Sequence, residues 1–197
     1  MKVVVITDTH GLAQIILDNH KDLLINIDLV ILLGDMYNFE IDIIVNTFKN
    51  IPIIGIHGNH DDINLFDNTS IIDIHKNIYI QDHISFCGFQ GSSKYKSSQI
   101  FGYTQEESIK EIFTMPICDI LICHDGPFGY FDNTHAHCGL KGIYKYIKEY
   151  KPKTLFFGHH HKNRYFKISH TDCYNIYGLG IFNIEKGKVI DWLCYGF

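Results

Sequence analysis

The chain has 197 residues, 46% of them hydrophobic and 20% charged, with a formal net charge of −5. This length and composition suit a soluble globular protein, and we expect a single domain over residues 1–197. The acidic balance, without any run of like charges, argues against a dedicated nucleic-acid binder, and no apolar run has the length of a membrane span.

The chain begins with a short apolar run at residues 2–7, which is too short for a signal peptide and is followed by no small-residue cleavage site. The six cysteines are scattered and include no C-x-x-C pair. Without a secretion signal this pattern favours free thiols over disulfides. We therefore expect a cytoplasmic protein.

The first third of the chain alternates between strand and helix patterns. Apolar runs at 2–7, 29–33 and 51–56 predict buried strands, and helically spaced apolar residues predict helices over 12–23 and 41–48. Such alternation is typical of parallel strands joined by right-handed crossovers, with helices covering the sheet.

The remaining two thirds contain further strands and two more helices. Residues 77–80 and 83–89 predict a hairpin, and Thr104 with Glu107 forms a capping box at the start of a helix. A second amphipathic helix begins near Leu140 and stops near Pro152. Further buried strands lie at 119–123 and 154–157, and short strand-like runs follow from 173 onward, where we expect antiparallel strands that form or extend a second sheet. The chain therefore predicts an α/β fold, a two-sheet sandwich flanked by helices.

Polar side chains follow five of the predicted strands, at the point where each strand ends. A single Asp or His after a strand is usually a turn residue or a helix cap, but five strand ends in succession are hard to ascribe to turns. In sheets of this kind, ligands bind just beyond the carboxyl ends of the strands. The residues at the five ends are Asp8 and His10; Gly34 and Asp35; Gly58, Asn59, His60 and Asp61; His124; and Gly158, His159, His160 and His161.

These residues offer oxygen and imidazole ligands without a thiolate, a set that suits Mn, Fe, Zn, Ni or Co more than a structural Cys-rich zinc site. They are too many for one ion. A pair of divalent ions about 3.5–4 Å apart that share a bridging carboxylate would use them all. We expect two divalent ions, with Mn²⁺ as the first choice and Fe, Zn, Ni or Co as alternatives.

The ordered set D-x-H, G-D, G-N-H-D, a lone His and G-H-x-H resembles the calcineurin-like metallophosphoesterases, and in particular their small bacterial-type phosphodiesterases. It extends over residues 2–165 in the order and spacing of that family, and G-N-H-D together with G-H-x-H is a specific signal. The segment from His124 resembles the family's H-G-P-P-type loop, with Gly126 at the position of the first proline. This departure weakens the subgroup assignment and leaves the ligand set intact.

The resemblance implies a metallophosphoesterase-type αββα sandwich and two metal positions that share Asp35. Because residues two apart in an extended segment point the same way, His159 and His161 would face the metals, and His160 would be a bystander or make a supporting hydrogen bond. By the resemblance, the first metal is held by Asp8, His10, Asp35 and His161, and the second by Asp35, Asn59, His124 and His159.

The implied activity is hydrolysis of a phosphoester by in-line attack of a hydroxide that bridges the metals. In this family the residue at His60 is not a ligand, and it stabilises the transition-state charge or protonates the leaving oxygen. Asp61 would orient His60 through the other ring nitrogen, although a role as a helix N-cap is equally open.

Other residues near the motifs have weaker claims. We expect His57 to be a strand-end histidine with a backbone hydrogen bond, and His135 and His137 to be loop or pocket-wall residues. The sequence leaves the roles of His57, His137 and His160 open. Aromatic residues that flank the motif loops could stack against a base, but such residues more often pack in the protein: Tyr37, Phe39, Phe128, Tyr130 and Phe131.

The sequence favours a small-molecule phosphodiester as the substrate. The short chain leaves no room for a cap domain, its acidic charge offers no track for a nucleic-acid polymer, and Arg164 alone lies near a motif as a clamp for a phosphate dianion. The alternatives are a phosphomonoesterase with the same site and a silent scaffold like the retromer subunit of this family, whose members lack the histidine at position 60. A nuclease lacks its extra domain here, and a protein phosphatase lacks its Asp-Arg-Gly and G-N-H-E motifs. We expect no membrane partner, and the oligomeric state stays open.

Overall fold

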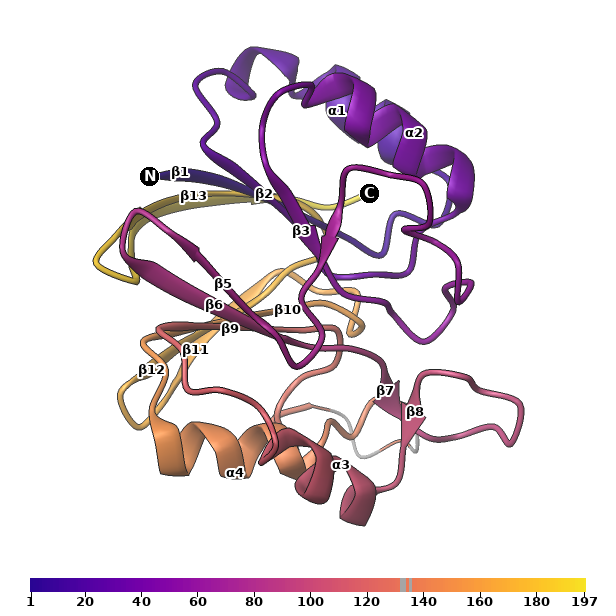
Figure 1. The fold of residues 1–197 in the computed structure, drawn as a ribbon, viewed down its shortest axis with the longest axis vertical. Coiled ribbons are helices and arrows are strands. Elements are labelled where there is room, and N and C mark those ends of the chain that lie inside the picture. The colour runs from indigo at the N-terminus through magenta and orange to yellow at the C-terminus, as the bar shows by residue number, and fades with distance from the viewer. Residues whose placement is uncertain (132–133, 135) are drawn as a thin grey trace.

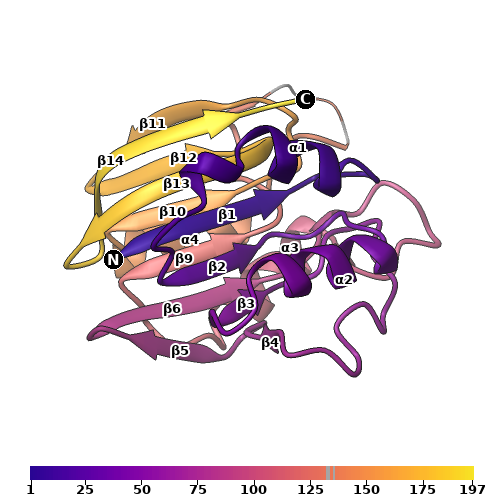
Figure 2. The same ribbon diagram turned by 90° about the horizontal axis from the view of Figure 1, so that it is seen from above.

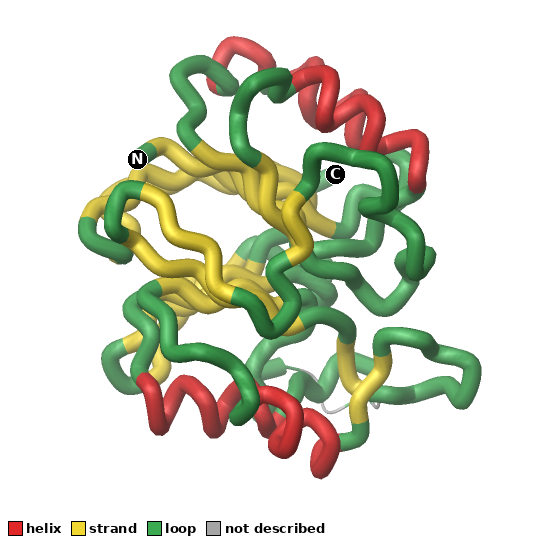
Figure 3. Tube along the Cα trace, in the orientation of Figure 1, coloured by secondary structure: helices red, strands yellow, loops and turns green. Residues whose placement is uncertain are grey.

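Two six-stranded sheets lie face to face in the computed structural model, which describes residues 1–131, 134 and 136–197. Helices cover the outer face of each sheet (Figure 1; Figure 3). The predicted two-sheet α/β sandwich is therefore confirmed. The longest helices have ten residues, and no helix in the described ranges has the length and apolar character that a membrane crossing requires.

The first sheet combines the N-terminal strands with the C-terminal hairpin. β1, β2, β3 and β4 run parallel, whereas β13 lies antiparallel to β1 and β14 antiparallel to β13. We predicted the last strands in a second sheet, and this was wrong for β13 and β14. The order across the sheet is β14 (Lys188–Tyr195), β13 (Gly178–Glu185), β1 (Lys2–Thr7), β2 (Leu29–Leu32), β3 (Ile53–Gly55) and β4 (Ile72–Asp73).

The second sheet has a parallel centre and an antiparallel hairpin at each edge. Its parallel strands are β6, β9, β10 and β12, while β5 pairs antiparallel with β6 as predicted and β11 antiparallel with β12. The order is β11 (Arg164–Ile168), β12 (Thr171–Asn175), β10 (Thr154–Phe157), β9 (Ile120–Cys123), β6 (Ile84–Phe89) and β5 (Ile78–Gln81). A separate pair, β7 (Ser92–Ser93) and β8 (Gly102–Tyr103), follows β6.

The helices match the predicted periodicity, with one shorter than expected. α1 (Ala13–Asn19) and α2 (Asn38–Thr47) cover the first sheet, and α3 (Gln105–Ile112) and α4 (Lys141–Tyr150) the second. The predicted helix over 12–23 ends at Asn19, where Nδ1 of His20 lies 2.8 Å from the Ile16 carbonyl, and a short 3₁₀ turn follows at Lys21–Leu23. Both hydrogen bonds of the predicted capping box are present at α3.

The side chains of β1 point alternately to the two faces of its sheet, and both faces are buried. Val3 and Val5 point into the core between the two sheets, where they meet residues such as Phe156, whereas Val4 and Ile6 pack under the helices. Burial of each such side chain contributes about 1.5–3 kcal/mol. The strands are therefore held rigidly on both sides up to their ends.

The carboxyl ends of the strands that precede the five motifs meet at one edge of the sandwich. β1, β2 and β3 are mutually parallel, as are β9 and β10, and Figure 2 shows β1 and β2 pointing toward the same edge. Five rigid strands therefore deliver their loops to a common region.

Candidate metal centre and active site

Six of the seven predicted metal ligands form two compact groups at this edge. We name them site A (Asp8, His10 and His161) and site B (Asp35, His124 and His159). Within each group the ligand atoms lie within 4.8 Å of one another. The seventh predicted ligand, Asn59, lies beside site B, because its Oδ1 is 3.0 Å from Nε2 of His124. The sequence-predicted set is thus brought together.

Five of these residues have a left-handed backbone conformation, which side chains other than glycine rarely adopt. The φ angles are 52° at Asp8, 44° at His10, 58° at Asp35, 66° at His159 and 47° at His161. Each such residue costs on the order of 1–3 kcal/mol, and strain of this kind gathers at functional sites where the surrounding fold enforces it. The motif loops therefore turn sharply at these five residues, directly after the strands.

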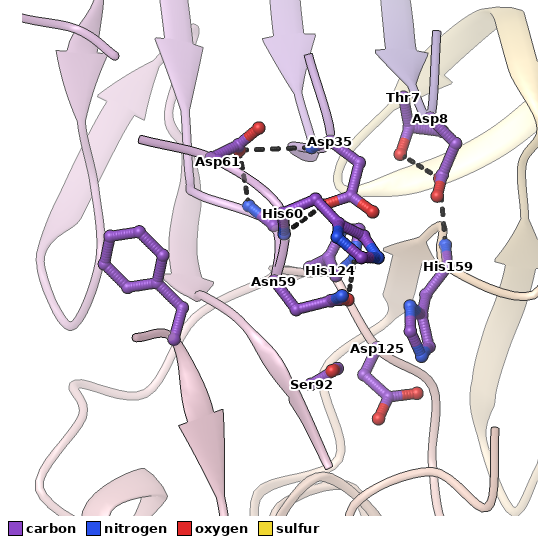
Figure 4. Close-up of polar contacts among 12 residues, drawn as sticks. Thr7, Asp8, Asp35, Asn59, His60, Asp61, Ser92, His124, Asp125 and His159 are labelled. Carbon is purple, nitrogen blue, oxygen red and sulfur yellow. Dashed lines mark hydrogen bonds and ion pairs between the residues drawn. The ribbon is translucent and has the colours of Figure 1, made fainter. Parts of the chain in front are cut away.

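In site A, the environment of Asp8 fits a cation (Figure 4). Its Oδ2 accepts hydrogen bonds from the Thr7 hydroxyl at 2.6 Å and the His159 N–H at 2.9 Å. Within the described residues, its buried Oδ1 accepts no hydrogen bond and lies 3.4 Å from Nε2 of His161. Burial works against ionisation, but the neighbouring imidazoles of His161 and His124 and the donors to Oδ2 keep the pKa of Asp8 well below its usual range. A buried carboxylate oxygen without a donor suits a metal ion.

In site B, a lone pair on Nε2 of His124 and a lone pair on Oδ1 of Asn59 face each other. Nδ1 of His124 lies 2.7 Å from the Leu33 carbonyl and so carries the proton, which leaves Nε2 to face Oδ1 of Asn59. The carboxylate of Asp35 is 3.5 Å from the same nitrogen. Burial lowers the pKa of His124, but the neighbouring carboxylates offset this and raise it overall. Either a proton or a cation must separate these acceptors, and the surrounding ligands favour a cation.

The other imidazole of site B, His159, is held neutral and oriented. Its Nε2 lies 2.7 Å from the Ala136 carbonyl, so Nε2–H is donated there and Nδ1 is free for a metal. Burial lowers the pKa of His159 to about 4. A neutral imidazole with one committed nitrogen is the form that binds metal ions.

The loops after β2 and β3 are packed without space for side chains between them. A Cβ atom on Gly58 would lie 2.1 Å from Oδ1 of Asp35, so only glycine fits at this position of the G-N-H-D motif. The same oxygen accepts the backbone N–H of His60 at 2.9 Å. Asp35 is thus fixed by the backbone of the neighbouring motif.

Asp61 has different partners from those we predicted. Its carboxylate accepts backbone N–H groups from Gly58 at 2.6 Å, Met36 at 2.8 Å and Asp35 at 3.1 Å. Burial, together with the nearby Asp35, raises the pKa of Asp61 to about 7. Asp61 therefore ties the loops after β2 and β3 together, rather than acting through the His60 ring or as a helix cap.

His60 lies at the exposed side of the site, above His10. Their ring centroids are 6.2 Å apart, and Nε2 of His60 is 3.3 Å from the hydroxyl of Tyr95. The predicted partner of the ring, Asp61, is thus replaced by a tyrosine that carries no sequence motif.

His160 lies outside both candidate ligand groups, as the alternation of side chains predicts. Its Nε2 lies 3.0 Å from Oδ1 of Asp125, and both side chains are almost fully buried. The imidazole ring stacks on the ring of Phe131, with ring centroids 3.7 Å apart. A Cβ on Gly126 would lie 2.9 Å from Nε2 of His160 and 2.7 Å from the Phe157 ring, which explains why the family's first proline is absent. His160 and Asp125 thus lock together the loops after β9 and β10.

We expect His160→Ala to lower the free energy of unfolding by about 3 kcal/mol, because it removes the imidazole partner of the buried Asp125 carboxylate and leaves it backbone donors only. Urea unfolding of metal-free protein measures this effect. His170→Ala is the matched control, since His170 is exposed and should change stability by less than about 0.5 kcal/mol. A loss below about 1 kcal/mol in His160→Ala would show that the pair does not hold the loops.

The remaining candidate histidines are placed as follows. His57 is packed between the rings of Phe66 and Phe101, and its carbonyl accepts the N–H of Gly91. The His137 ring lies 5.0 Å from the His159 ring, so this residue lies beside a candidate metal ligand. His135 falls outside the described residues.

Four of the five motif-flanking aromatic residues divide into two groups, and Phe128 is 37% exposed under the ammonium of Lys141. Phe131 stacks on His160 and Tyr130 stacks on Phe166, so both pack within the protein. Tyr37 and Phe39 contact each other and are 54% exposed, which leaves their rings open to a ligand.

Sequence reasoning missed three residues that support the site, namely Thr7, Tyr95 and Asp125. Thr7 and Asp125 adjoin predicted ligands, and a hydroxyl or carboxylate beside a metal motif was the available signal. Tyr95 comes from a polar stretch, G-S-S-K-Y-K-S-S-Q, with no motif, and only the fold brings it to His60.

Comparison with known families agrees with this geometry. A family model described as a calcineurin-like phosphoesterase superfamily domain matches residues 1–180. No curated protein sequence matches the chain at a significant level.

Several solved structures share the fold at low sequence identity. A novel archaeal phosphodiesterase is 18% identical with a TM-score of 0.59, over 99% of this chain and 100% of the other. The phosphopantetheinyl hydrolase PptH from Mycobacterium tuberculosis is 11% identical with a TM-score of 0.61, over 88% of each chain. Zinc-bound Vps29 from Entamoeba histolytica is 12% identical with a TM-score of 0.54, over 99% of this chain and 97% of the other. At these identities the likeness shows a common fold.

Proposed function

Because this chain belongs to the calcineurin-like phosphoesterase superfamily, we propose that it is a dinuclear metal-dependent phosphodiesterase acting on a small molecule. The family and the two candidate ligand groups support a hydrolase of phosphoesters. The dinuclear phosphodiesterase proposal is supported most by two candidate ligand groups that lie together beside one exposed histidine, His60. His60 itself argues against a silent scaffold, because the scaffold members of the family lack a histidine at this position.

In this proposal, Asp35 serves both metals, with Asp8, His10 and His161 completing one position and Asn59, His124 and His159 the other. Two bound divalent ions, with Mn²⁺ as the first candidate, would neutralise phosphate charge and supply an ionised water as nucleophile. The chain's own contribution is orientation. The Leu33 and Ala136 carbonyls fix the imidazole nitrogens of His124 and His159, and the Asp61 carboxylate fixes the loop that carries Asp35.

His60 would act on the substrate without holding a metal. It is exposed beside the metal groups, and a groove of about 260 Å³ opens next to it, lined by Asn59, Tyr95 and Lys96 among others. A neutral imidazole can stabilise charge on the departing oxygen, and a protonated one can give it a proton. The size of the groove suits a small organic group rather than a polymer.

The preference for a diester rests on charge. A phosphomonoester dianion is usually gripped by a bidentate arginine, whereas a diester carries one negative charge less. Arg164 is the chain's single arginine, and its Nη1 donates to the Tyr130 carbonyl at 3.2 Å while the guanidinium lies over Phe131 and Phe166. It is therefore committed to a structural contact.

We expect kcat/KM for an aryl phosphodiester to be at least as high as that for the matching monoester when both are measured with Mn²⁺-loaded protein. The His60→Ala variant, purified in parallel, controls for contaminating phosphatases. A strong preference for the monoester would overturn the diester proposal and favour a phosphomonoesterase.

A further inference from the structure

Tyr95 reaches the proposed active site from a projecting loop rather than from a strand end. We call residues 92–103, which contain β7, β8 and the loop between them, the β7–β8 arm; it projects beside the strand ends in Figure 1. The Tyr95 hydroxyl lies 3.3 Å from Nδ2 of Asn59 and 3.3 Å from Nε2 of His60. One oxygen thus contacts both a proposed metal ligand and the proposed acid–base group.

The β7–β8 arm is internally braced so that Tyr95 is held in place. The side chain of Gln99 lies inside the loop, where its Nε2 donates to Oγ of Ser92 at 2.9 Å and to the Phe101 carbonyl at 3.4 Å. Its Oε1 accepts the backbone N–H of Tyr95 at 3.2 Å. One glutamine therefore joins β7 and the residue just before β8 to the residue that carries the hydroxyl.

The arm is also tied to the loop that carries His124. The backbone N–H of Ser93 donates to Oδ2 of Asp125 at 3.0 Å, and Asp125 is fully buried. The base of the arm is thus anchored to the residue directly after a proposed ligand. This anchoring makes the position of Tyr95 part of the site's architecture.

The hydrogen-bond pattern is consistent in its donors and acceptors. The amide of Asn59 directs its oxygen to His124 and its nitrogen to Tyr95, so Nδ2–H is donated to the tyrosine oxygen. The hydroxyl proton is then available for Nε2 of His60. When Nε2 is itself protonated, the second lone pair of the tyrosine oxygen can accept from it. The contact can therefore persist in both protonation states of His60.

We propose that Tyr95 is a positioning residue that fixes the ring of His60 toward the substrate, while the Asn59 amide holds the tyrosine oxygen in place. The catalytic part of this inference rests on the proposed function. The tyrosine acts through His60, so its loss should matter most when the departing group needs a proton. It should matter little when the departing group leaves readily without one.

The first test uses metal-free protein and needs no activity. Two-bond ¹⁵N–¹H correlation spectra report the protonation of each imidazole nitrogen, and the His60 signals are assigned by their loss in His60→Ala. We expect Tyr95→Phe to shift the His60 Nε2 resonance. Tyr103→Phe is the matched control, because it removes a hydroxyl from the same arm at a ring that packs on Phe89. Unchanged His60 resonances in Tyr95→Phe would overturn the inference.

The second test compares two methyl aryl phosphodiesters with Mn²⁺-loaded protein, one releasing nitrophenol and the other phenol. We expect Tyr95→Phe to lower kcat about tenfold for the phenyl ester, as loss of one hydrogen bond does, and less than about threefold for the nitrophenyl ester. KM and metal content should not change. Gln99→Ala should reproduce this pattern, and the double variant should be no worse than Tyr95→Phe.

The outcomes separate this inference from the proposed function. An equal loss of kcat for both esters, or no loss for either, would show that Tyr95 does not act through His60. A wild-type protein that hydrolyses no phosphoester with any metal would sink the proposed function instead. The spectra of metal-free protein would then decide the Tyr95 contact by themselves.

Discussion

Replacement of Asp35 by asparagine is expected to reduce metal binding from two ions per chain to at most one and to lower activity by more than about 100-fold. Loss of an outer-shell partner already costs about 10–100-fold, and a shared ligand should cost more. The size of the side chain is kept, and the amide oxygen can still accept the His60 N–H that Asp35 accepts now. The effect should therefore come from the lost charge.

Elemental analysis and titration of stripped, Mn²⁺-reloaded protein measure this change, together with turnover of an aryl phosphodiester. Asp42→Asn, on an exposed position of α2, removes the same charge away from the site and should bind two ions like the wild type. A wild-type protein that never holds more than one ion would end the dinuclear proposal. An Asp35→Asn variant that keeps both ions would end the bridging role.

The strands and their order along the chain could be predicted because their signal is local. An apolar run such as 2–7 is buried on both faces, and the structure shows why: Val3 and Val4 face two different cores. The neighbour of a strand is not a local property. β13 pairs with β1 from the far end of the chain, and nothing in its apolar pattern indicates which sheet it joins.

The gathering of the motif residues was predictable for a similar reason, because parallel strands bring their carboxyl ends to one edge. Their division into ligands and a separate acid–base histidine rests on the family resemblance and stays a prediction. The motifs did not indicate what surrounds the ligands. Asp61 binds three backbone N–H groups and His160 holds Asp125, and both contacts depend on how one loop lies against another. The role of Tyr95 could not be predicted either, because its contact with His60 also depends on how the loops pack. The extent of the domain over residues 1–197 stays a prediction.

His60→Ala is expected to lower kcat by about 10²–10⁴-fold, the usual contribution of an acid–base group, without loss of bound metal. The backbone N–H of His60, not its ring, donates to Asp35, and alanine keeps that donor. The ring lies at the exposed side of the site, so its removal creates no buried cavity. Metal content should therefore stay at the wild-type value.

Turnover of an aryl phosphodiester and elemental analysis of the same sample test both halves of this statement. His83→Ala is the control, because His83 is exposed at the β5–β6 turn and carries no motif. If His60→Ala lost its metals, His60 would be a structural part of the ligand loops, and the hydrogen bond from its backbone would be insufficient to hold Asp35. If it kept full activity, the departing oxygen would need no help from the chain, and the contact with Tyr95 would lose its catalytic meaning.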